Sequence, residues 1–150
     1  MSSKSDEKEL RRILAEIRIL ESVLEDLRNR FNITESALAE LKIAGSTLEN
    51  LERKGTNTEI LVPIGAGSYI KAKLESTDVV IVGVGSGVAI EKSWEEAKEA
   101  VGNRIAQIEK IRNELQRRIV AVMQRINEER NKAQELAAKL KIGAEGVKSA

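Results

Sequence analysis

The chain has 150 residues, of which 33% are charged and 41% hydrophobic, and its 25 Lys and Arg side chains nearly balance its 24 Asp and Glu side chains. That balance argues against a nucleic-acid-binding protein, which needs an excess of positive charge to contact phosphates. The sequence has no Cys, no His and only 2% aromatic residues, which argues against disulfide scaffolds, zinc fingers, histidine-based catalysis and an ordinary compact core.

This composition is typical of a charge-rich coiled coil with an inserted module. Residues 1–9 are polar and lead into an amphipathic segment, and no run of about 18 apolar residues is present to cross a bilayer. We therefore expect a cytoplasmic protein, with which the absence of Cys is compatible.

Residues 6–54 are predicted to form one long helix. Alternating steps of three and four residues separate the members of an apolar seam, which is the pattern of a heptad repeat. The seam consists of Leu10, Ile13, Ile17, Leu20, Leu24, Leu27, Phe31, Thr34, Leu38, Leu41, Gly45 and Leu48, with Thr34 and Gly45 as its weak points. A strict seven-residue repeat predicts left-handed supercoiling. At a rise of about 1.5 Å per residue such a helix is roughly 70 Å long, so it has to project into solvent.

Residues 55–92 change to a period of two, which predicts β structure. Strands at residues 60–64, 69–74, 79–82 and 88–92 would form two β-hairpins with glycine-rich turns. Four short strands cannot cover both faces of residues 79–82, and open sheet edges are normally paired. We therefore expect this segment to be an oligomerisation module. Its candidate contact residues are Ile60, Val62, Ile64, Ile70, Leu74, Val80, Val82, Val88 and Ile90.

The sequence gives little indication of a catalytic or nucleotide-binding site. The glycines at residues 83–87 resemble part of a dinucleotide-binding fingerprint, but the third glycine should fall at Val88 and a helix should follow. A hairpin turn or bulge is favoured instead, and no catalytic residue, metal or cofactor is expected. The carboxylate pairs Glu95/Glu96 and Glu128/Glu129 are expected on solvent-exposed helix faces, without a pocket that would shift their pKa.

Residues 93–142 are predicted to form a second long helix. Ser93 and Glu96 match a capping box, and Trp94 is interpreted as packing where the helix meets the sheet. A second seam consists of Val101, Ile105, Ile108, Leu115, Ile119, Val122, Ile126, Ala133, Leu136 and Leu140, and is interrupted by Arg112 and Glu129. Gly143 and Gly146 are predicted to end the helix, which leaves residues 143–150 as a mobile tail.

The two predicted helices are similar in length and carry opposite net charges, which favours an antiparallel helical hairpin. In that register Leu10 lies near Leu136, and both ends of the chain meet at the free end of the coiled coil. The expected fold class is α+β, mainly α, in a single domain of residues 1–150.

Apolar residues near this free end form a second candidate site. They are Leu10, Ile13, Leu14, Ile17, Leu136, Leu140 and Ile142. Helix ends fray, because their last turns lack full hydrogen bonding and packing. Periodicity alone leaves two interpretations open: a seam that simply runs to its end, or an apolar surface that is intermittently exposed for binding.

The order of helix, two β-hairpins and helix resembles the prefoldin family. Residues 62–74 (VPIGAGSYIKAKL) and 78–93 (DVVIVGVGSGVAIEKS) are similar to the two hairpins of its α class, whereas the β class has one. The resemblance is greatest to archaeal α subunits. It implies that two α and four β subunits join their hairpins in a double β-barrel platform, from which six coiled coils project.

The resemblance also implies a role for each candidate site. The apolar residues near the free end would bind non-native polypeptides and deliver them to a group II chaperonin without ATP, and the hairpin residues would form the barrel. Two alternatives remain. One is a structural scaffold or tether without affinity for unfolded proteins, and the other is a nucleotide-binding domain or enzyme that uses the turn at residues 83–87.

Overall fold

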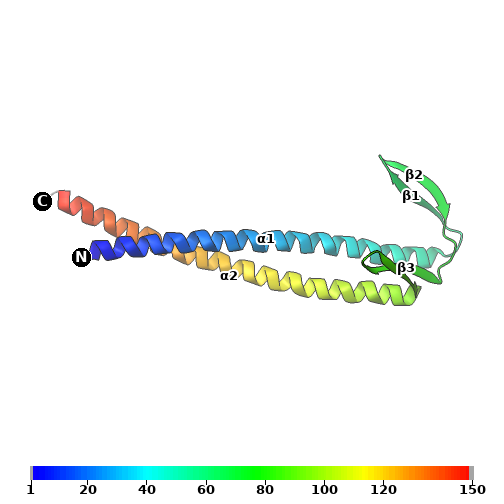
Figure 1. Ribbon diagram of the computed structural model, residues 1–150. Coiled ribbons are helices and arrows are strands. Elements are labelled where there is room, and N and C mark those ends of the chain that lie inside the picture. The colour runs from blue at the N-terminus through cyan, green and yellow to red at the C-terminus, as the bar shows by residue number, and fades with distance from the viewer. Residues whose placement is uncertain (1, 149–150) are drawn as a thin grey trace. The chain divides into compact units, whose positions relative to one another are not determined.

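The protein is described by a computed structural model that covers residues 2–148, with side chains for residues 3–143. Along the chain, four strands lie between two long helices (Figure 1). The elements are α1 (Ser2–Lys54), β1 (Glu59–Gly65), β2 (Ser68–Lys73), β3 (Val79–Gly85), β4 (Val88–Ser93) and α2 (Trp94–Lys148). The predicted mainly helical α+β class, with two β-hairpins between two helices, is confirmed.

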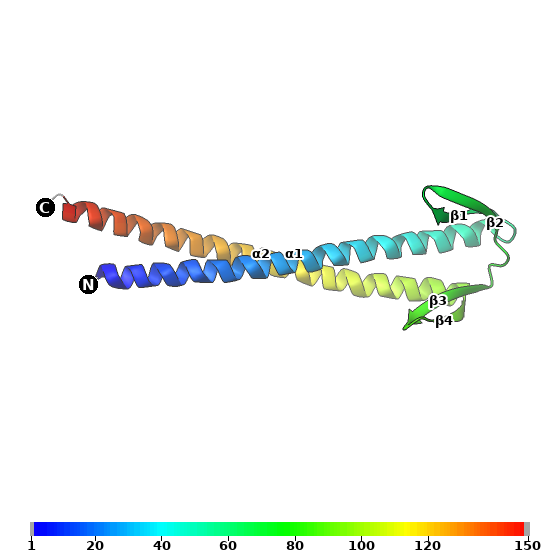
Figure 2. The same cartoon turned by 45° about the horizontal axis from the view of Figure 1, so that its top comes forward.

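The chain divides into two compact units, each built from both helices. The terminal unit contains residues 1–34 and 111–150, and the hairpin unit contains residues 35–110. Within each unit α1 and α2 lie side by side and run in opposite directions, as Figures 1 and 2 both show. The predicted antiparallel pairing of the helices is therefore confirmed within both units.

Burial along α1 follows the predicted heptad seam. All twelve predicted seam positions are buried or half-buried, including Thr34 and Gly45. The deepest are Ile13, Leu27 and Leu38, each 2% exposed. Off the seam, apolar residues such as Ile33 remain exposed, at 71%. The helix therefore pairs through one apolar stripe, as a coiled-coil helix does.

The helix ends differ from the prediction. Helix α1 begins at Ser2, and α2 continues to Lys148 through both Gly143 and Gly146, so the prediction that these glycines end the helix is wrong. Glycine lowers helix propensity by about 1 kcal/mol but keeps its backbone N–H donor, unlike proline, so a helix can pass through it. Residues 149–150 of the predicted tail lie outside the described residues.

The two hairpins have the same local geometry. Strands β1 and β2 pair antiparallel, as do β3 and β4, and each pair has a register shift just before its turn. In the first turn φ is 102° at Gly65, 51° at Ala66 and 71° at Gly67, and the second turn has three left-handed residues in the same order. Because left-handed backbone favours glycine, this geometry accounts for the glycine spacing of both turns.

The second turn excludes the dinucleotide-binding interpretation. A fingerprint of that kind requires a helix after the glycines, whereas the turn after β3 leads into β4. The predicted hairpin turn at residues 83–87 is confirmed. Among the described residues, neither helix combines the length and the apolar character that a membrane span needs.

Candidate functional site

The first candidate surface lies on the β-hairpins. In the first hairpin Val62 pairs with Ile70 across the strands, and Ile60 lies on the same face. Val62 is 37% exposed and Ile70 is 52% exposed. Facing apolar residues that stay open to solvent on a small two-stranded sheet are typical of an interaction surface.

The second hairpin repeats this arrangement, since Val82 pairs with Ile90. The predicted contact residues that are exposed in this chain are Val62, Ile64, Ile70, Val88 and Ile90. Those that are half-buried are Ile60, Leu74, Val80 and Val82. Val80 and Val82 line a groove whose other walls come from α1 and α2 of the same unit, which accounts for their lower exposure.

The predicted contact residues leave out the opposite faces of the hairpins. Leu61 and Tyr69 in the first hairpin are 61% and 59% exposed, and Val79 and Ile81 in the second are 45% and 73% exposed. The prediction chose one face of each alternating strand. For β3, the uninterrupted apolar run at residues 79–82 had already indicated that both faces need cover.

The start of α2 fastens the second hairpin to α1. The indole Nε1 of Trp94 donates a hydrogen bond of 2.9 Å to the backbone carbonyl of Leu48, and Trp94 is buried. The Glu96 amide donates to the Ser93 hydroxyl at 3.1 Å, and the Ser93 amide donates to the Glu96 carboxylate at 3.4 Å. The predicted capping box and the packing of Trp94 at the joint are confirmed.

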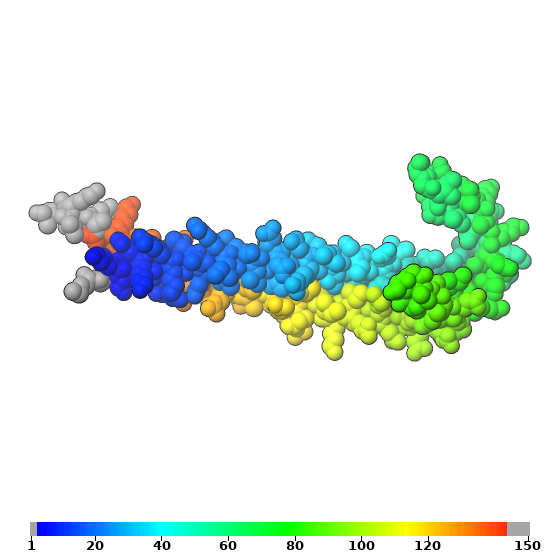
Figure 3. Space-filling view, viewed as in Figure 1, coloured from blue at the N-terminus to red at the C-terminus, as the bar shows by residue number. Residues whose placement is uncertain are grey.

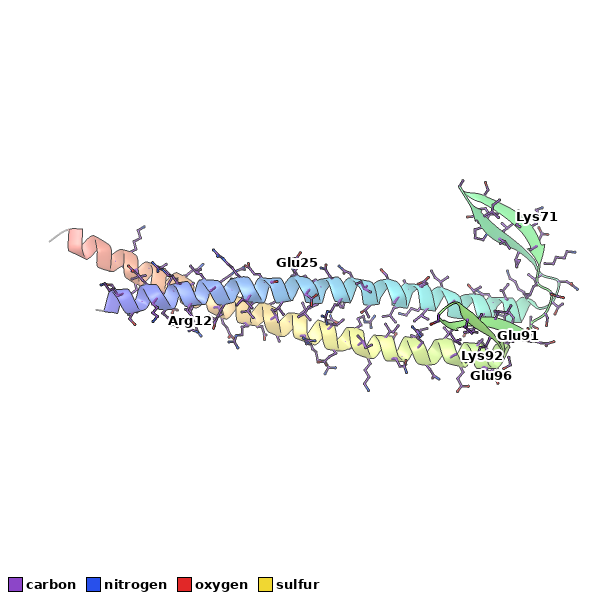
Figure 4. All side chains as sticks on the ribbon, viewed as in Figure 1. Arg12, Glu25, Lys71, Glu91, Lys92 and Glu96 are labelled. Carbon is purple, nitrogen blue, oxygen red and sulfur yellow. The ribbon has the colours of Figure 1, made fainter. Side chains whose placement is uncertain are left out.

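Lys98 adds a charged link at the same joint. Its Nζ lies 2.9 Å from a carboxylate oxygen of Glu52 on α1 and 3.1 Å from one of Glu95. Hydrogen bonding to Glu52, and then to Glu95, raises the pKa of Lys98. Glu95 and Glu96 are exposed, as predicted, and Figure 4 shows Glu96 at the start of α2. These carboxylates therefore bind Lys98 and the Ser93 amide at the joint, and they do not line a catalytic pocket.

The second candidate surface lies in the terminal unit. Ile13, Ile17 and Ala133 form a buried core, against which the half-buried Leu10 and Leu136 pack. We call these five residues the terminal cluster. Both Leu10 and Leu136 contact the same core, which agrees with the predicted register. The space-filling view in Figure 3 shows the first turns of α1 lying against α2 in this unit.

The structure brings only some of the predicted end residues together. Leu10, Ile13, Ile17 and Leu136 belong to the terminal cluster. Leu14 is 45% exposed and Ile142 is 70% exposed, outside that cluster, and Leu140 is half-buried. Of the predicted end residues, Leu14 and Ile142 are therefore exposed, whereas the terminal cluster is covered by the pairing of the helices.

Arg12 organises the charges beside the terminal cluster. It donates hydrogen bonds to Glu9 and, at 3.0 Å, to Glu16, which lie one turn away on either side. The hydrogen bond from Arg12 lowers the pKa of Glu9, and the same bond raises the pKa of Arg12. This charged group keeps the outer face of α1 hydrated beside an apolar seam.

Ion pairs between described residues also join the helices of the terminal unit. Arg130 lies 2.7 Å from Glu21, and Lys139 lies 3.4 Å from Asp6. Both cations are more than half exposed, and exposed ion pairs contribute only about 0–1 kcal/mol each. The helix ends are therefore held together mainly by the terminal cluster.

Glu129 corrects one expectation about the carboxylates. Its neighbour Glu128 is exposed, as predicted, but Glu129 is only 6% exposed. The expectation of a solvent-exposed face fails for Glu129 because the helix turns this position toward α1, between Ile126 and Ala133 of the seam. The interruption of the heptad pattern at this residue was the sequence signal for its burial.

Comparisons with known proteins agree with this architecture. The sequence matches the Prefoldin family, described as prefoldin subunit, over residues 20–139. It is 36% identical to prefoldin subunit alpha of Methanopyrus kandleri over 79% of this chain and 78% of the relative. It is 35% identical to prefoldin subunit alpha 2 of Thermococcus kodakarensis over 91% of this chain and 96% of the relative.

A solved structure has a similar fold. It is the cryo-EM structure of filamentous PFD from Methanocaldococcus jannaschii, one chain of which aligns with a TM-score of 0.64 at 27% identity, over 75% of this chain and 93% of that chain. The family match covers most of the sequence. The chain has two β-hairpins, and the relative to which it is 36% identical is an alpha subunit. The chain therefore belongs to the prefoldin family, of the archaeal alpha-subunit type, and is a chaperone subunit and not an enzyme.

Proposed function

We propose that this chain is a subunit of an ATP-independent holdase that captures non-native polypeptides at the end of its coiled coil and delivers them to a group II chaperonin. The observation that carries the proposal is the terminal cluster, a small apolar core at the helix ends flanked by the exposed Leu14 and Ile142. Separation of the helix ends would add Ile13 and Ile17 to this surface. An unfolded chain offers scattered apolar side chains, which suit such a surface.

Assembly is the second part of the proposal. An alpha-type subunit implies association with beta subunits, and we infer a hexamer of two alpha and four beta subunits joined through residues 55–92. The exposed apolar residues of both hairpins support this role, because a two-stranded sheet is marginally stable by itself and gains from further strands. A cytoplasmic location is part of the same proposal, and the absence of Cys is compatible with it.

Multivalency explains why weak contacts would suffice. Several linked arms raise the effective concentration of each binding surface, so the combined affinity exceeds a single contact by about 10² to 10⁴. Each contact still dissociates quickly, which permits transfer of the bound chain to a chaperonin.

The test measures aggregation of a guanidinium-denatured enzyme by light scattering in the presence of the chain assembled with a prefoldin beta subunit. Removal of residues 1–14 and 137–150 should raise the concentration of complex needed for half-suppression by at least about tenfold, because the arms lose their apolar ends. Native mass spectrometry should show an unchanged hexamer. Equal suppression by the truncated complex would overturn the assignment of the binding site.

A structural tether is the second candidate function. It is favoured by the burial of Ile13 and Ile17, which are 2% and 8% exposed in the closed coiled coil and so resemble ordinary seam residues. A tether would leave aggregation of the denatured enzyme unchanged at any concentration of the intact complex. The same light-scattering assay therefore separates the two functions.

A further inference from the structure

The seam of α2 is interrupted in the terminal unit by a carboxylate. Glu129 lies between Ile126 and Ala133 and is 6% exposed, compared with 3% and 8% for these neighbours. Its Oε2 atom is buried and accepts no hydrogen bond from any described residue. Its Oε1 atom lies 3.7 Å from the Nζ of Lys132 on the same helix, and the Lys132 side chain is itself 62% exposed. One oxygen of this carboxylate is thus buried without a hydrogen-bond partner in the described part of the chain.

Helix α1 does not supply the missing partner. Arg12 is the basic residue of α1 whose charge reaches Glu129, but it donates its hydrogen bonds to Glu9 and Glu16 on its own helix. The hydrogen bond to Glu9 is the main reason that the pKa of Arg12 is raised. Glu129 therefore stays underpaired for as long as the helices remain packed.

A buried carboxylate opposes the packing that buries it. Removing an ionised group from water without full hydrogen bonding costs free energy, whereas burying an apolar side chain of similar size is favourable. Separation of the helices lets water reach the carboxylate and recovers that cost. A seam residue of this kind therefore favours local opening, whereas leucine at the same position favours closure.

The apolar contacts between Glu129 and the chain ends are few. The terminal cluster has three buried members, of which Ala133 is small, and its other two members are only half-buried. Local stability falls where few apolar contacts are buried and where a helix ends. Along α2, Glu129 thus lies between the terminal cluster, close to the helix ends, and Ile126, where the seam continues.

We propose that Glu129 is the opening point of the coiled coil: it uncouples the terminal cluster from the rest of the seam and biases the helix ends to separate. Opening exposes Ile13 and Ile17, which the closed state covers. The opening is a property of this chain alone. Its use, presentation of the cluster to a non-native polypeptide, rests on the proposed function.

Hydrogen–deuterium exchange of the full chain tests the opening. In Glu129→Leu, amides of residues 9–20 should exchange about tenfold more slowly than in the unaltered chain, because closure is no longer opposed by a buried charge. Glu128→Leu is the matched control, since it makes the same chemical change at the adjacent exposed position. It should leave exchange in residues 9–20 unchanged.

Unchanged exchange in Glu129→Leu, or equal slowing in Glu128→Leu, would overturn the proposal. Glu129→Gln guards against a leucine variant that folds differently, because it nearly keeps the shape of the side chain while removing its charge. Its exchange in residues 9–20 should also be slower than in the unaltered chain, by a smaller factor. Faster or equal exchange in Glu129→Gln would likewise reject the role of the charge.

The light-scattering assay then separates this inference from the proposed function. If the opening serves capture, the complex carrying Glu129→Leu should need several-fold more protein for half-suppression of aggregation. Full suppression by that complex, together with slowed exchange, would overturn the use of the opening in capture. If the unaltered complex suppresses nothing, the proposed function fails, while the exchange result still decides whether Glu129 opens the coiled coil.

Discussion

Arg12 shows how a single side chain orders its surroundings on an exposed helix face. Its guanidinium bridges Glu9, three residues earlier, and Glu16, four residues later. Oppositely charged pairs at these spacings face each other on the helix surface and stabilise the helix modestly. The bridge begins about two turns after the start of α1 at Ser2, so it stabilises a part of the helix close to its end.

The lowered pKa of Glu9 predicts a pH dependence. Because the folded-state pKa lies below the ordinary value of 4.5, the contact with Arg12 stabilises the folded chain at neutral pH and is lost as the pH falls through the folded-state pKa. Glu9→Gln should therefore lower the urea midpoint at pH 7, and the difference from the unaltered chain should shrink toward pH 3. Circular dichroism at 222 nm, a conventional helix signal, provides the measurement.

Glu25→Gln is the matched control for this measurement. Glu25 is an exposed carboxylate on the same helix and is labelled in Figure 4. Its substitution should shift the urea midpoint less than that of Glu9 at pH 7. A difference between Glu9→Gln and the unaltered chain that grows toward pH 3 would contradict the argument.

Glycines within the helices show how elements tolerate locally unfavourable residues. Gly45 occupies a seam position of α1, and Gly102 lies on the exposed face of α2. A Cβ at Gly45 would lie 3.5 Å from Val101 Cγ1, an ordinary contact distance, whereas one at Gly102 would have no neighbouring atom within 4 Å. Both helices continue through these positions because pairing along the seam outweighs the lost propensity.

Alanine at these positions should stabilise the hairpin unit. Gly102→Ala should raise the free energy of unfolding by about 0.5–1 kcal/mol, because it changes helix propensity alone. Gly45→Ala should raise it by at least as much, since the added methyl group also contacts Val101. Urea unfolding of the full chain measures both changes. Destabilisation by Gly45→Ala alone would show that the seam needs the close approach of the helices there.

At the scale of the whole molecule, the hairpins and the helix ends differ in how their apolar residues are covered. The hairpins leave apolar residues exposed that one chain cannot cover by itself, including Ile64 at 62% and Ile81 at 73%. The helix ends hold a cluster that is covered while the coiled coil is closed. One surface therefore suits permanent burial by neighbouring subunits, and the other suits reversible exposure.

Charges on the first hairpin should block assembly. The double substitution Val62→Lys and Ile70→Lys places two cations on facing residues that the proposed barrel buries, and an unpaired buried charge costs several kcal/mol. Native mass spectrometry with a beta subunit should show loss of the hexamer, while the helical circular dichroism of the chain stays unchanged. Ile19→Lys is the control, because Ile19 is 64% exposed on α1, outside the hairpins. A hexamer that survives the double substitution would reject the hairpins as the assembly surface.

Periodicity was sufficient to predict which residues share a face. The heptad spacing identified the α1 seam, and the change to a period of two located both hairpins. The glycines of residues 83–87 were correctly assigned to a turn. These features depend on local backbone geometry, which neighbouring residues dictate, so the chain itself was enough to establish them.

How deeply each residue is buried could be determined only from the folded structure. Spacing placed Glu129 in the seam, but its burial without a hydrogen-bond partner depends on how closely α1 approaches and on Arg12 pairing with Glu9 and Glu16. The exposure of Ile81 and the cover over Val80 likewise depend on which elements lie beside β3. A residue's position on a helix or strand follows from its neighbours in the chain, whereas its access to water and to partners is set by segments distant in sequence.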